Sequence, residues 1–287
     1  MNLFLPAGTT TTDEDLLNIT PATAGWTYCG LRVMRLAGGE SRLVDTGTAE
    51  TAVLPLSGGC TVEVEDHRFE LEGRDGVFLG ISDFAYVPVG VEVRIIATRP
   101  AEIALCSAEA SRRVEPYRVA AGDIKVEVRG GGSASRQINN FLSADNNRAH
   151  RLIAVEVLTP ESDWSSWPPH KHDVQSDEEV QLEEIYYFRI DGEGGTGYFA
   201  CYTADREIDD TVTIRDGDVY LVPRGYHGPS VAGPGYHMYF LNVMGGPQDE
   251  RAWRFSTDPA HVWQLAELEK MDPDPRLPLT TADRPTT

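Results

Sequence analysis

Residues 214–230, IRDGDVYLVPRGYHGPS, follow the same plan as residues 73–90, GRDGVFLGISDFAYVPVG. Each stretch carries Arg-Asp-Gly, beginning at Arg74 and at Arg215, after one strand-like run and before another. Such internal similarity indicates two related β-domains in one chain. Only the second stretch carries a histidine, His227, near its final turn. The sequence therefore predicts a duplicated β-fold whose two copies differ at this position.

Short strand-like segments dominate the rest of the chain and are separated by Gly, Asp or Pro. Close spacing of short strands is typical of a sandwich or barrel, so we predict an all-β fold. One helix is expected at 258–271, with Asp258 as N-cap and Pro259 at the first helical position. The strand-like segments are TAVLPLSG, TVEVED, RFELEG, AYVPVG, VEVRIIAT and EIALCS in the first half, and LIAVEVLTP, EIYYFRIDG, GYFACYT, DTVTIRDG, DVYLVPRG and HMYFLNVMG in the second.

The domain boundary is expected in the segment 112–148, which is rich in Gly, Ser and Asn around 130–147. We predict an N-terminal domain at 1–134 without metal ligands and a C-terminal, metal-binding domain at 135–270. Residues 271–287 hold many Pro, Asp and Thr residues and few that could enter a core. They are expected to form a flexible tail.

Composition limits the classes of partner. The formal net charge is −20, from 45 acidic and 25 basic residues, and such a charge disfavours binding to nucleic acid or to anionic membranes. No apolar run approaches the ~20 residues of a membrane helix, and the acidic start lacks the basic region of a secretory signal. We therefore expect a cytoplasmic protein. The four cysteines form no CxxC pair, which disfavours a zinc–thiolate site or a disulfide framework.

Residues 168–173, PPHKHD, place two of the chain's seven histidines one residue apart. In an extended strand, His170 and His172 point to the same face with their Cα atoms ~6.6 Å apart, and Lys171 points away. The preceding prolines favour extended backbone at this point. Two imidazoles on one face can chelate a divalent ion, and a carboxylate with a third imidazole would complete a mixed nitrogen and oxygen site.

The carboxylate ligand is expected at the start of the next strand, IYYFRI. Glu184 directly precedes this strand and would share a face with Tyr186 and Phe188, so we choose it. Glu178 and Glu179 are closer to the histidines in sequence and remain alternatives, because the loop 173–183 could fold either way. The third imidazole is assigned to His227, which follows a strand and a Pro-Arg-Gly turn.

These residues resemble the cupin superfamily. The longer pattern DWSSWPPHKHD, EEIYYFRI, DGDVYLVPRGYH and YFLNVMGGP, densest from about 151 to 263, resembles the 5-deoxy-glucuronate isomerases of myo-inositol catabolism. Their relatives are the 4-deoxy-5-hexosulose-uronate ketol-isomerases of pectin breakdown. The resemblance implies two cupin domains and one metal site, in the second domain. It also implies a metal-dependent aldose–ketose isomerisation of a deoxy-uronic acid that gives 5-dehydro-2-deoxy-gluconate.

The expected reaction moves a proton between adjacent carbons through an enediol, and a divalent ion would offset the charge on oxygen. Three histidines and a glutamate suit zinc or manganese, with iron or nickel as alternatives. Tyr186 could carry a proton or simply line the cavity, and Glu179 or Glu183 could be the base. Arg224 is expected to bind the substrate carboxylate. A homo-oligomer is also expected.

Three other functions remain open at this point. The first is the ketol-isomerase reaction on pectin-derived uronates, which uses the same chemistry on another sugar acid. The second is a metal-dependent cupin dioxygenase, which would consume oxygen. The third is a sugar-binding cupin without enzymatic activity, which we rank last because the sequence shows no DNA-binding motif.

Overall fold

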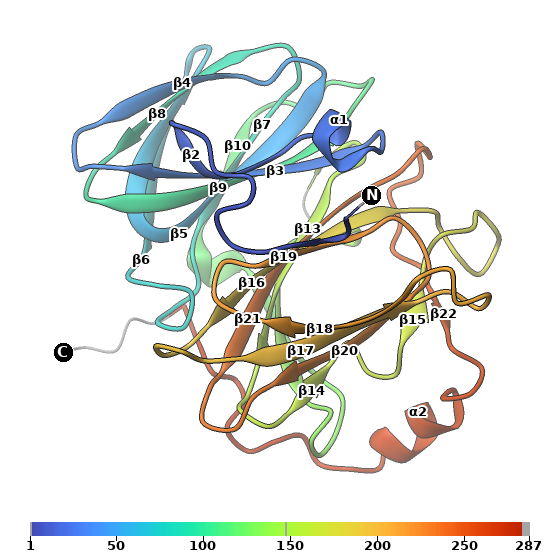
Figure 1. Cartoon of the computed structure of the whole chain (residues 1–287). Helices are drawn as coiled ribbons and strands as arrows, with labels where there is room; N and C mark the ends of the chain where they lie inside the picture. The colour runs from blue at the N-terminus through green and yellow to red at the C-terminus, as the bar shows by residue number, and fades with distance from the viewer. Residues whose placement is uncertain (1, 147, 283–287) are drawn as a thin grey trace.

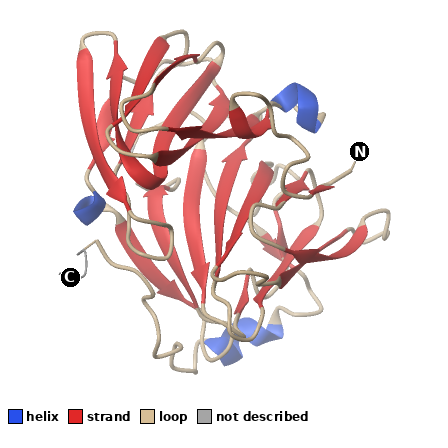
Figure 2. Ribbon diagram, turned by 60° about the vertical axis from the view of Figure 1, so that its left-hand side comes forward, coloured by secondary structure: helices blue, strands red, loops and turns tan. Residues whose placement is uncertain are grey.

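Two β-domains make up the computed structural model, which describes residues 2–146 and 148–282. The N-terminal domain lies above the C-terminal domain in Figure 1, and strands far outnumber helices in Figure 2. The helical segments in the described residues are short: α1 (Pro21–Ala24), the 3₁₀ helix η1 (Ala121–Asp123) and α2 (Trp263–Leu268). The predicted all-β class is confirmed.

The N-terminal domain is built around the long strand β5, which pairs with strands on both of its sides. The path β10-β7-β5-β9-β3-β2 is extended by β4, β6 and β8. An apolar cluster that includes Met34, Val62 and Ile95 fills the interior. The strands are β2 (Asp15–Ile19), β3 (Cys29–Leu36), β4 (Ser41–Asp45), β5 (Ala49–Val64), β6 (His67–Arg74), β7 (Phe84–Val87), β8 (Glu92–Ala97), β9 (Ala101–Glu109) and β10 (Tyr117–Val119).

The C-terminal domain contains a seven-stranded sheet, β1-β19-β16-β21-β13-β12-β11, and a six-stranded sheet, β18-β17-β20-β15-β22, which β14 joins through β20. Its strands are β1 (Phe4–Leu5), β11 (Lys125–Arg129), β12 (Arg136–Leu142), β13 (Ile153–Thr159), β14 (Trp164–Ser165), β15 (His170–Lys171), β16 (Glu183–Ile190), β17 (Gly197–Tyr202), β18 (Asp209–Ile214), β19 (Val219–Val222), β20 (Tyr226–Ala232), β21 (Met238–Gly245) and β22 (Ser256–Thr257).

Strand pairing repeats between the two domains. The pairs β4–β8, β5–β7 and β5–β9 of the first domain correspond to β15–β20, β16–β19 and β16–β21 of the second. His170 faces His227 across β15 and β20, whereas β4 and β8 of the first domain contain no histidine.

Strand β16 is buried on both faces, and its alternation separates two cores. Ile185 and Tyr187 pack in a cluster that joins the two domains. Tyr186 and Phe188 pack in the interior of the second domain, and Glu184 is buried at 1% exposure at the start of the same face. The sequence prediction that Glu184 shares a face with Tyr186 and Phe188 agrees with this arrangement.

The division at 134/135 does not separate the two sheets. β11, from the predicted first domain, pairs with β12 along the edge of the seven-stranded sheet. At the opposite edge of that sheet, β1 from the extreme N-terminal region pairs with β19, as Figure 1 shows. Residues 2–5 and 125–129 thus complete the second domain. Added edge strands satisfy backbone groups that an open edge would leave unpaired, a long-range effect that composition does not reveal.

Two further expectations need correction. The predicted helix at 258–271 is helical only over Trp263–Leu268, because Asp258 bonds to the amide of Ala260 in a turn before it. The tail predicted to be flexible is anchored over 271–282. Thr280 is buried and its backbone bonds to the side-chain amide of Gln137 in β12. A buried glutamine side chain needs such partners. Residues 283–287 lie outside the described residues.

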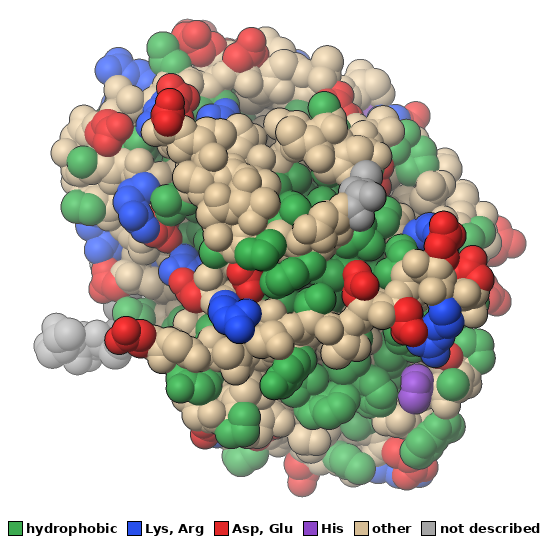
Figure 3. All heavy atoms as spheres, viewed as in Figure 1, with side chains coloured by type: hydrophobic (Ala, Val, Ile, Leu, Met, Phe, Trp, Pro, Cys, Tyr) green, Lys and Arg blue, Asp and Glu red, His purple; other side chains and the backbone are tan. Residues whose placement is uncertain are grey.

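The outer surface mixes charges of both signs. Figure 3 shows Asp and Glu interspersed with Lys and Arg on the face seen in Figure 1, with hydrophobic side chains gathered across its middle and lower part. Within residues 2–146 and 148–282, no helix combines the length and apolar character needed to cross a membrane.

Candidate metal centre

Three histidines converge inside the second domain. His170 lies in β15 directly opposite His227 in β20, and His172 follows β15. One ring nitrogen from each of the three lies within 4.8 Å of the others. His172 and His227 are buried at 2% and 0% exposure, and His170 is partly buried. The sequence prediction that these three imidazoles lie close together agrees with this geometry.

Backbone carbonyls orient two of the imidazoles. Nδ1 of His172 lies 3.1 Å from the carbonyl oxygen of Leu182, and Nδ1 of His227 lies 3.1 Å from that of Gly225. Because a carbonyl can only accept, each Nδ1 carries the proton and donates it. In the neutral rings each Nε2 then carries the lone pair, and both Nε2 atoms face Oε2 of Glu184. This is the arrangement in which protein imidazoles bind metal ions.

Glu184 completes the cluster. Its Oε2 lies 3.0 Å from Nε2 of His172 and 3.1 Å from Nε2 of His227. Burial opposes ionisation of Glu184, yet its contacts with His172 and His227 hold its pKa at about 2. Burial and the imidazoles of His227 and His172 hold the pKa of His170 well below its usual value. The cluster therefore favours a charged carboxylate beside a neutral imidazole at His170.

The cluster fits a divalent cation. Nε2 of His227 is buried and has no hydrogen-bond partner among the described residues. A buried acceptor without a partner is costly, and a bound cation would remove this cost. Three imidazole nitrogens and one carboxylate are a donor set that suits zinc, manganese, iron or nickel. The structure therefore contains a buried histidine triad that could bind a metal ion.

The competing glutamates have other contacts. Glu178 is exposed on the loop before β16. Glu179 is buried, but its carboxylate accepts from the backbone amides of Asp173 and Val174 and from Nζ of Lys171. These bonds hold the loop that follows the histidine pair. Glu184 is the one of the three whose carboxylate contacts the imidazoles.

Glu183 faces away from the cluster. Its carboxylate accepts hydrogen bonds from the backbone amides of Thr27, Tyr28 and Cys29 in the first domain, at 2.8, 2.7 and 3.2 Å. Burial raises the pKa of Glu183 in spite of these bonds. The position of Glu183 is that of an interdomain contact, so the structure does not place it where a base for the expected reaction would act.

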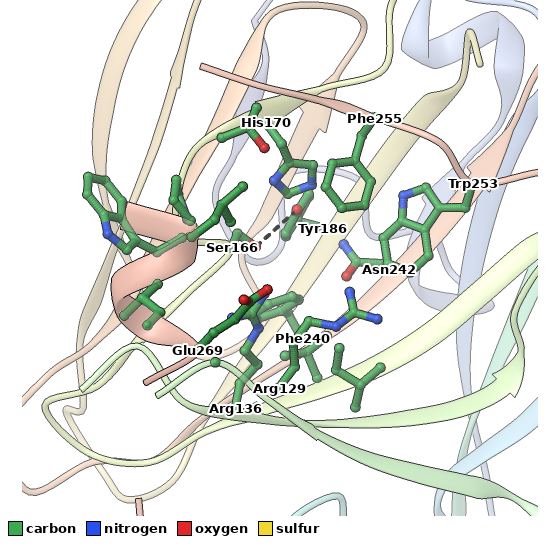
Figure 4. Close-up of a pocket in the computed structure, with 18 residues that line it drawn as sticks. Arg129, Arg136, Ser166, His170, Tyr186, Phe240, Asn242, Trp253, Phe255 and Glu269 are labelled. Atoms are coloured by element: carbon green, nitrogen blue, oxygen red, sulfur yellow. Dashed lines mark hydrogen bonds between the residues drawn. The ribbon is translucent and has the colours of Figure 1, made fainter. Parts of the chain in front are cut away.

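A cavity of about 300 Å³ adjoins the cluster and contains His170 in its wall. Figure 4 shows His170 at the upper end of this cavity and Tyr186 beside it, with Arg129, Arg136 and Glu269 at the lower end. The hydroxyl of Tyr186 lies 3.4 Å from Oγ of Ser166. Burial and the charge of Glu184 raise the pKa of Tyr186 well above its usual value. Its phenol is therefore a proton donor rather than a base at neutral pH.

Arg224 does not line this cavity. Its guanidinium pairs with Glu207 on the surface, and the cations in the cavity wall are Arg129 and Arg136. Sequence reasoning missed these arginines, together with the cavity residues Asn242 and Trp253. Proximity in sequence to His227 suggested Arg224, but alternation along the chain carries its side chain outward. Arg136 has no local signal, since it lies in the segment read as a domain crossing.

The sequence profile of the KduI/IolB family matches residues 3–264. The chain belongs to the KduI/IolB family. A family member from Geobacillus kaustophilus (strain HTA426), a 5-deoxy-glucuronate isomerase, is 37% identical over 92% of this chain and 95% of its own length. The 5-deoxy-glucuronate isomerase of Bacillus subtilis (strain 168) is 37% identical over 86% of this chain and 91% of its own. The resemblance drawn from the sequence is thus confirmed.

Solved structures agree with the KduI/IolB assignment. An IolB-like protein from Salmonella typhimurium LT2 superposes with a TM-score of 0.85 at 32% identity, over 92% of this chain and 99% of that one. An oxalate decarboxylase from Bacillus subtilis superposes with a TM-score of 0.64 at 14% identity, over 93% of this chain and 84% of that one. The second likeness shows a common fold, and the predicted pair of cupin domains is confirmed.

Proposed function

We propose that this protein is a 5-deoxy-glucuronate isomerase that converts its substrate to 5-dehydro-2-deoxy-gluconate. The observation that carries the proposal is the similarity to isomerases of that name along almost the whole of both chains. The buried cluster of His170, His172, His227 and Glu184 beside a cavity of about 300 Å³ supports it. The reaction exchanges an aldehyde and a neighbouring alcohol for an alcohol and a ketone, with no net oxidation.

His170, His172, Glu184 and His227 would hold one divalent ion, for which zinc or manganese is our first expectation and iron or nickel the second. When bound, the ion would supply Lewis-acid stabilisation of the negative charge that develops on the sugar oxygens. The protein itself orients two of the imidazoles, because the backbone carbonyls of Leu182 and Gly225 accept hydrogen bonds from His172 and His227.

Tyr186 is the residue that we assign to proton handling. It lines the cavity, and its raised pKa keeps the phenol protonated, so it can donate to an oxygen of the substrate. Ser166 lies within reach of the same hydroxyl and can orient it. Phe240 and Phe255 contribute apolar walls, which limit the water that competes for protons in the cavity.

The biological setting follows from the same proposal. We infer a role in myo-inositol catabolism in the cytoplasm, with a small deoxy-uronic acid as the ligand. We also expect a homo-oligomer. The edge strand β11 supports this expectation, because it presents the partly exposed Val126 and Val128 along an open edge of the seven-stranded sheet.

The direct test is to incubate the purified protein with 5-deoxy-glucuronate and to follow the sugar by NMR. The proposal predicts loss of the C1 aldehyde (or hemiacetal) signal, appearance of a ketone carbon and no consumption of oxygen. A parallel incubation with 4-deoxy-5-hexosulose-uronate tests for the pectin-type isomerase activity. Measurement of oxygen uptake with an oxygen electrode tests for a dioxygenase activity. Conversion of 4-deoxy-5-hexosulose-uronate alone, or oxygen uptake, would contradict the proposal.

A further inference from the structure

Arg136, at the start of β12, is a cation without a compensating acid. Its guanidinium lines the cavity, and its hydrogen bond is to the carbonyl oxygen of Ala134, at 3.2 Å. Across residues 2–146 and 148–282, no carboxylate lies within ion-pair distance of it, although acidic residues outnumber basic ones by 45 to 25. Of the two arginines that line the cavity, Arg129 pairs with Glu127 and Arg136 has no such ion pair among the described residues.

A second arginine, Arg129, adds to the positive charge in the wall of the cavity. Arg129 in β11 is the direct cross-strand partner of Arg136. Arg129 bonds to Glu127 on its own strand, with Nε 2.8 Å from Oε1, and both arginines line the cavity. Like charges directly opposite each other destabilise a sheet. Burial and the neighbouring charge of Arg129 lower the pKa of Arg136 to about 10, which still leaves the guanidinium charged at neutral pH.

Two further donors lie in the same cavity. Nε1 of Trp253 is buried and has no hydrogen-bond acceptor among the described residues, and the side-chain amide of Asn242 is directed at the hydroxyl of Tyr186. Buried donors without acceptors are uncommon and costly in native proteins. Together with the guanidinium of Arg136, they give the cavity a surplus of hydrogen-bond donors. Such a lining favours a ligand that is rich in oxygen acceptors and carries negative charge.

Glu269 is the opposing feature. It is the carboxylate that lines the cavity, just after helix α2, and it lies with Arg129 and Arg136 at the lower end in Figure 4. It would repel an anionic ligand at the same end. Because it forms no ion pair with Arg136 in the described residues, it does not neutralise the guanidinium. Substitution of Glu269 by glutamine therefore removes a negative charge from the cavity, whereas substitution of Arg136 by alanine removes a positive charge.

We propose that Arg136 binds the carboxylate of the sugar acid and so sets its orientation, with Arg129 reinforcing the positive potential. This inference rests on the proposed function. In a uronic acid the carboxylate carbon, C6, lies at the opposite end of the carbon chain from C1 and C2, where the isomerisation occurs. In Figure 4 Arg136 and His170 lie at opposite ends of the cavity. A substrate held by its carboxylate at Arg136 therefore presents C1 and C2 to the histidine end.

The same contact accounts for selection of sugar acids over neutral sugars. A planar guanidinium can bind a carboxylate through two parallel hydrogen bonds. A neutral sugar with a hydroxymethyl group at C6 would leave the guanidinium charge of Arg136 without a counter-ion inside the cavity. Hydrogen bonds to charged groups contribute about 1.5–3 kcal/mol, so loss of this one corresponds to about 10- to 100-fold in affinity.

The binding test does not depend on turnover. The purified protein is titrated with D-glucuronate and with D-glucose, and binding is followed by calorimetry and by the fluorescence of Trp167 and Trp253, which line the cavity. We expect saturable binding of D-glucuronate that is about 10- to 100-fold weaker in Arg136→Ala, partly restored in Arg136→Lys and strengthened in Glu269→Gln. Arg113→Ala removes the same charge at a surface ion pair of the first domain and serves as the matched control.

The kinetic test uses 5-deoxy-glucuronate and its methyl ester. Arg136→Ala should raise KM for the acid by about 10- to 100-fold and leave the kinetics of the ester almost unchanged, because the ester carries no charge to bind. Thermal melting establishes that the variant is folded, and Arg136→Lys provides a second variant that retains a charge. Binding of D-glucuronate by Arg136→Ala as tight as by the unmodified protein would overturn the inference, as would failure of the unmodified protein to bind D-glucuronate.

The two tests separate this inference from the proposed function. If D-glucuronate binding depends on Arg136 but 5-deoxy-glucuronate is not isomerised, the anion site stands and the reaction is wrong. If 5-deoxy-glucuronate is isomerised and Arg136→Ala leaves KM unchanged, the reaction stands and the assignment of Arg136 is wrong.

Discussion

Oε2 of Glu184 lies 3.1 Å from Nε2 of His227, and these two atoms are both acceptors. Because Nδ1 of His227 donates its proton to the carbonyl of Gly225, the Nε2 that faces Glu184 presents a lone pair. A carboxylate this close to a neutral imidazole nitrogen needs a positive charge between them, which a proton or a metal ion can provide. A divalent ion would provide that charge and would also be bound by His170 and His172, so this contact links the fold to the proposed chemistry.

Glu184→Gln should remove most of the metal affinity. The amide is nearly isosteric but carries no charge, so we expect metal binding to weaken by at least about 10- to 100-fold, the loss typical of substitutions around metal ligands. Glu178→Gln is the control, because Glu178 is an exposed glutamate of the preceding loop. The metal content of the two variants, measured by plasma mass spectrometry, shows which of the two glutamates is the metal ligand. Full metal content in Glu184→Gln with loss in Glu178→Gln would contradict the assignment.

Tyr186→Phe should lower kcat by about 100-fold or more, since general acid catalysis typically contributes about 100- to 10,000-fold. KM and metal content should stay close to their original values, since the substitution removes only the hydroxyl. The raised pKa of Tyr186 predicts that its titration does not shape the pH dependence of kcat near neutrality. The pH profile of the variant should therefore keep its form at a lower height. An unchanged kcat would mean that Tyr186 only lines the cavity.

Glu183→Ala should destabilise the protein without impairing its chemistry. The substitution removes the acceptor for three backbone amides of the first domain, at Thr27, Tyr28 and Cys29. We expect a loss of about 2–4 kcal/mol in the free energy of unfolding. Glu183→Gln should cost less because its amide oxygen can still accept. Thermal melting and kcat at a temperature below both transitions provide the measurements. A large fall in kcat in the folded variant would indicate that Glu183 acts as the base and would contradict its assignment as an interdomain contact.

Removal of residues 271–287 should lower stability. The side chain of Gln137 is buried in β12 and exchanges hydrogen bonds with Thr280, at 2.9–3.0 Å. Truncation leaves this amide without partners, at a cost of about 1–3 kcal/mol. The effect should shrink when Gln137→Leu is already present, because the unsatisfied amide is then absent. Equal losses in both backgrounds, measured by chemical unfolding, would contradict the role of Thr280 as an anchor.

The fold was predictable because hydrophobic patterning and the Arg-Asp-Gly repeat are local signals. The proximity of His170, His172 and His227 was also predictable, since alternation in a strand and a turn after a strand restrict where these side chains point. Glu184 could be selected over its neighbours by the same alternation along EEIYYFRI, and its contacts with the imidazoles agree.

Long-range pairing explains what the sequence did not reveal. Arg136 enters the cavity because β12 adds to the sheet beside β13, whereas its local surroundings resemble a linker. The pairing of β1 with β19 and the hydrogen bonds between Thr280 and Gln137 join segments that are far apart in the chain. Helix α2 is shorter than its apolar spacing predicts, because Asp258 forms a turn with Ala260 instead of starting the helix.

The measurement that tests the account most directly is isomerisation of 5-deoxy-glucuronate by the purified protein before chelation, after chelation and after return of a divalent ion, with metal content determined in each sample. We predict close to one metal ion per chain in active protein, loss of activity in proportion to the metal removed, and recovery when zinc or manganese is added back. Full activity in protein from which all metal has been removed would contradict it.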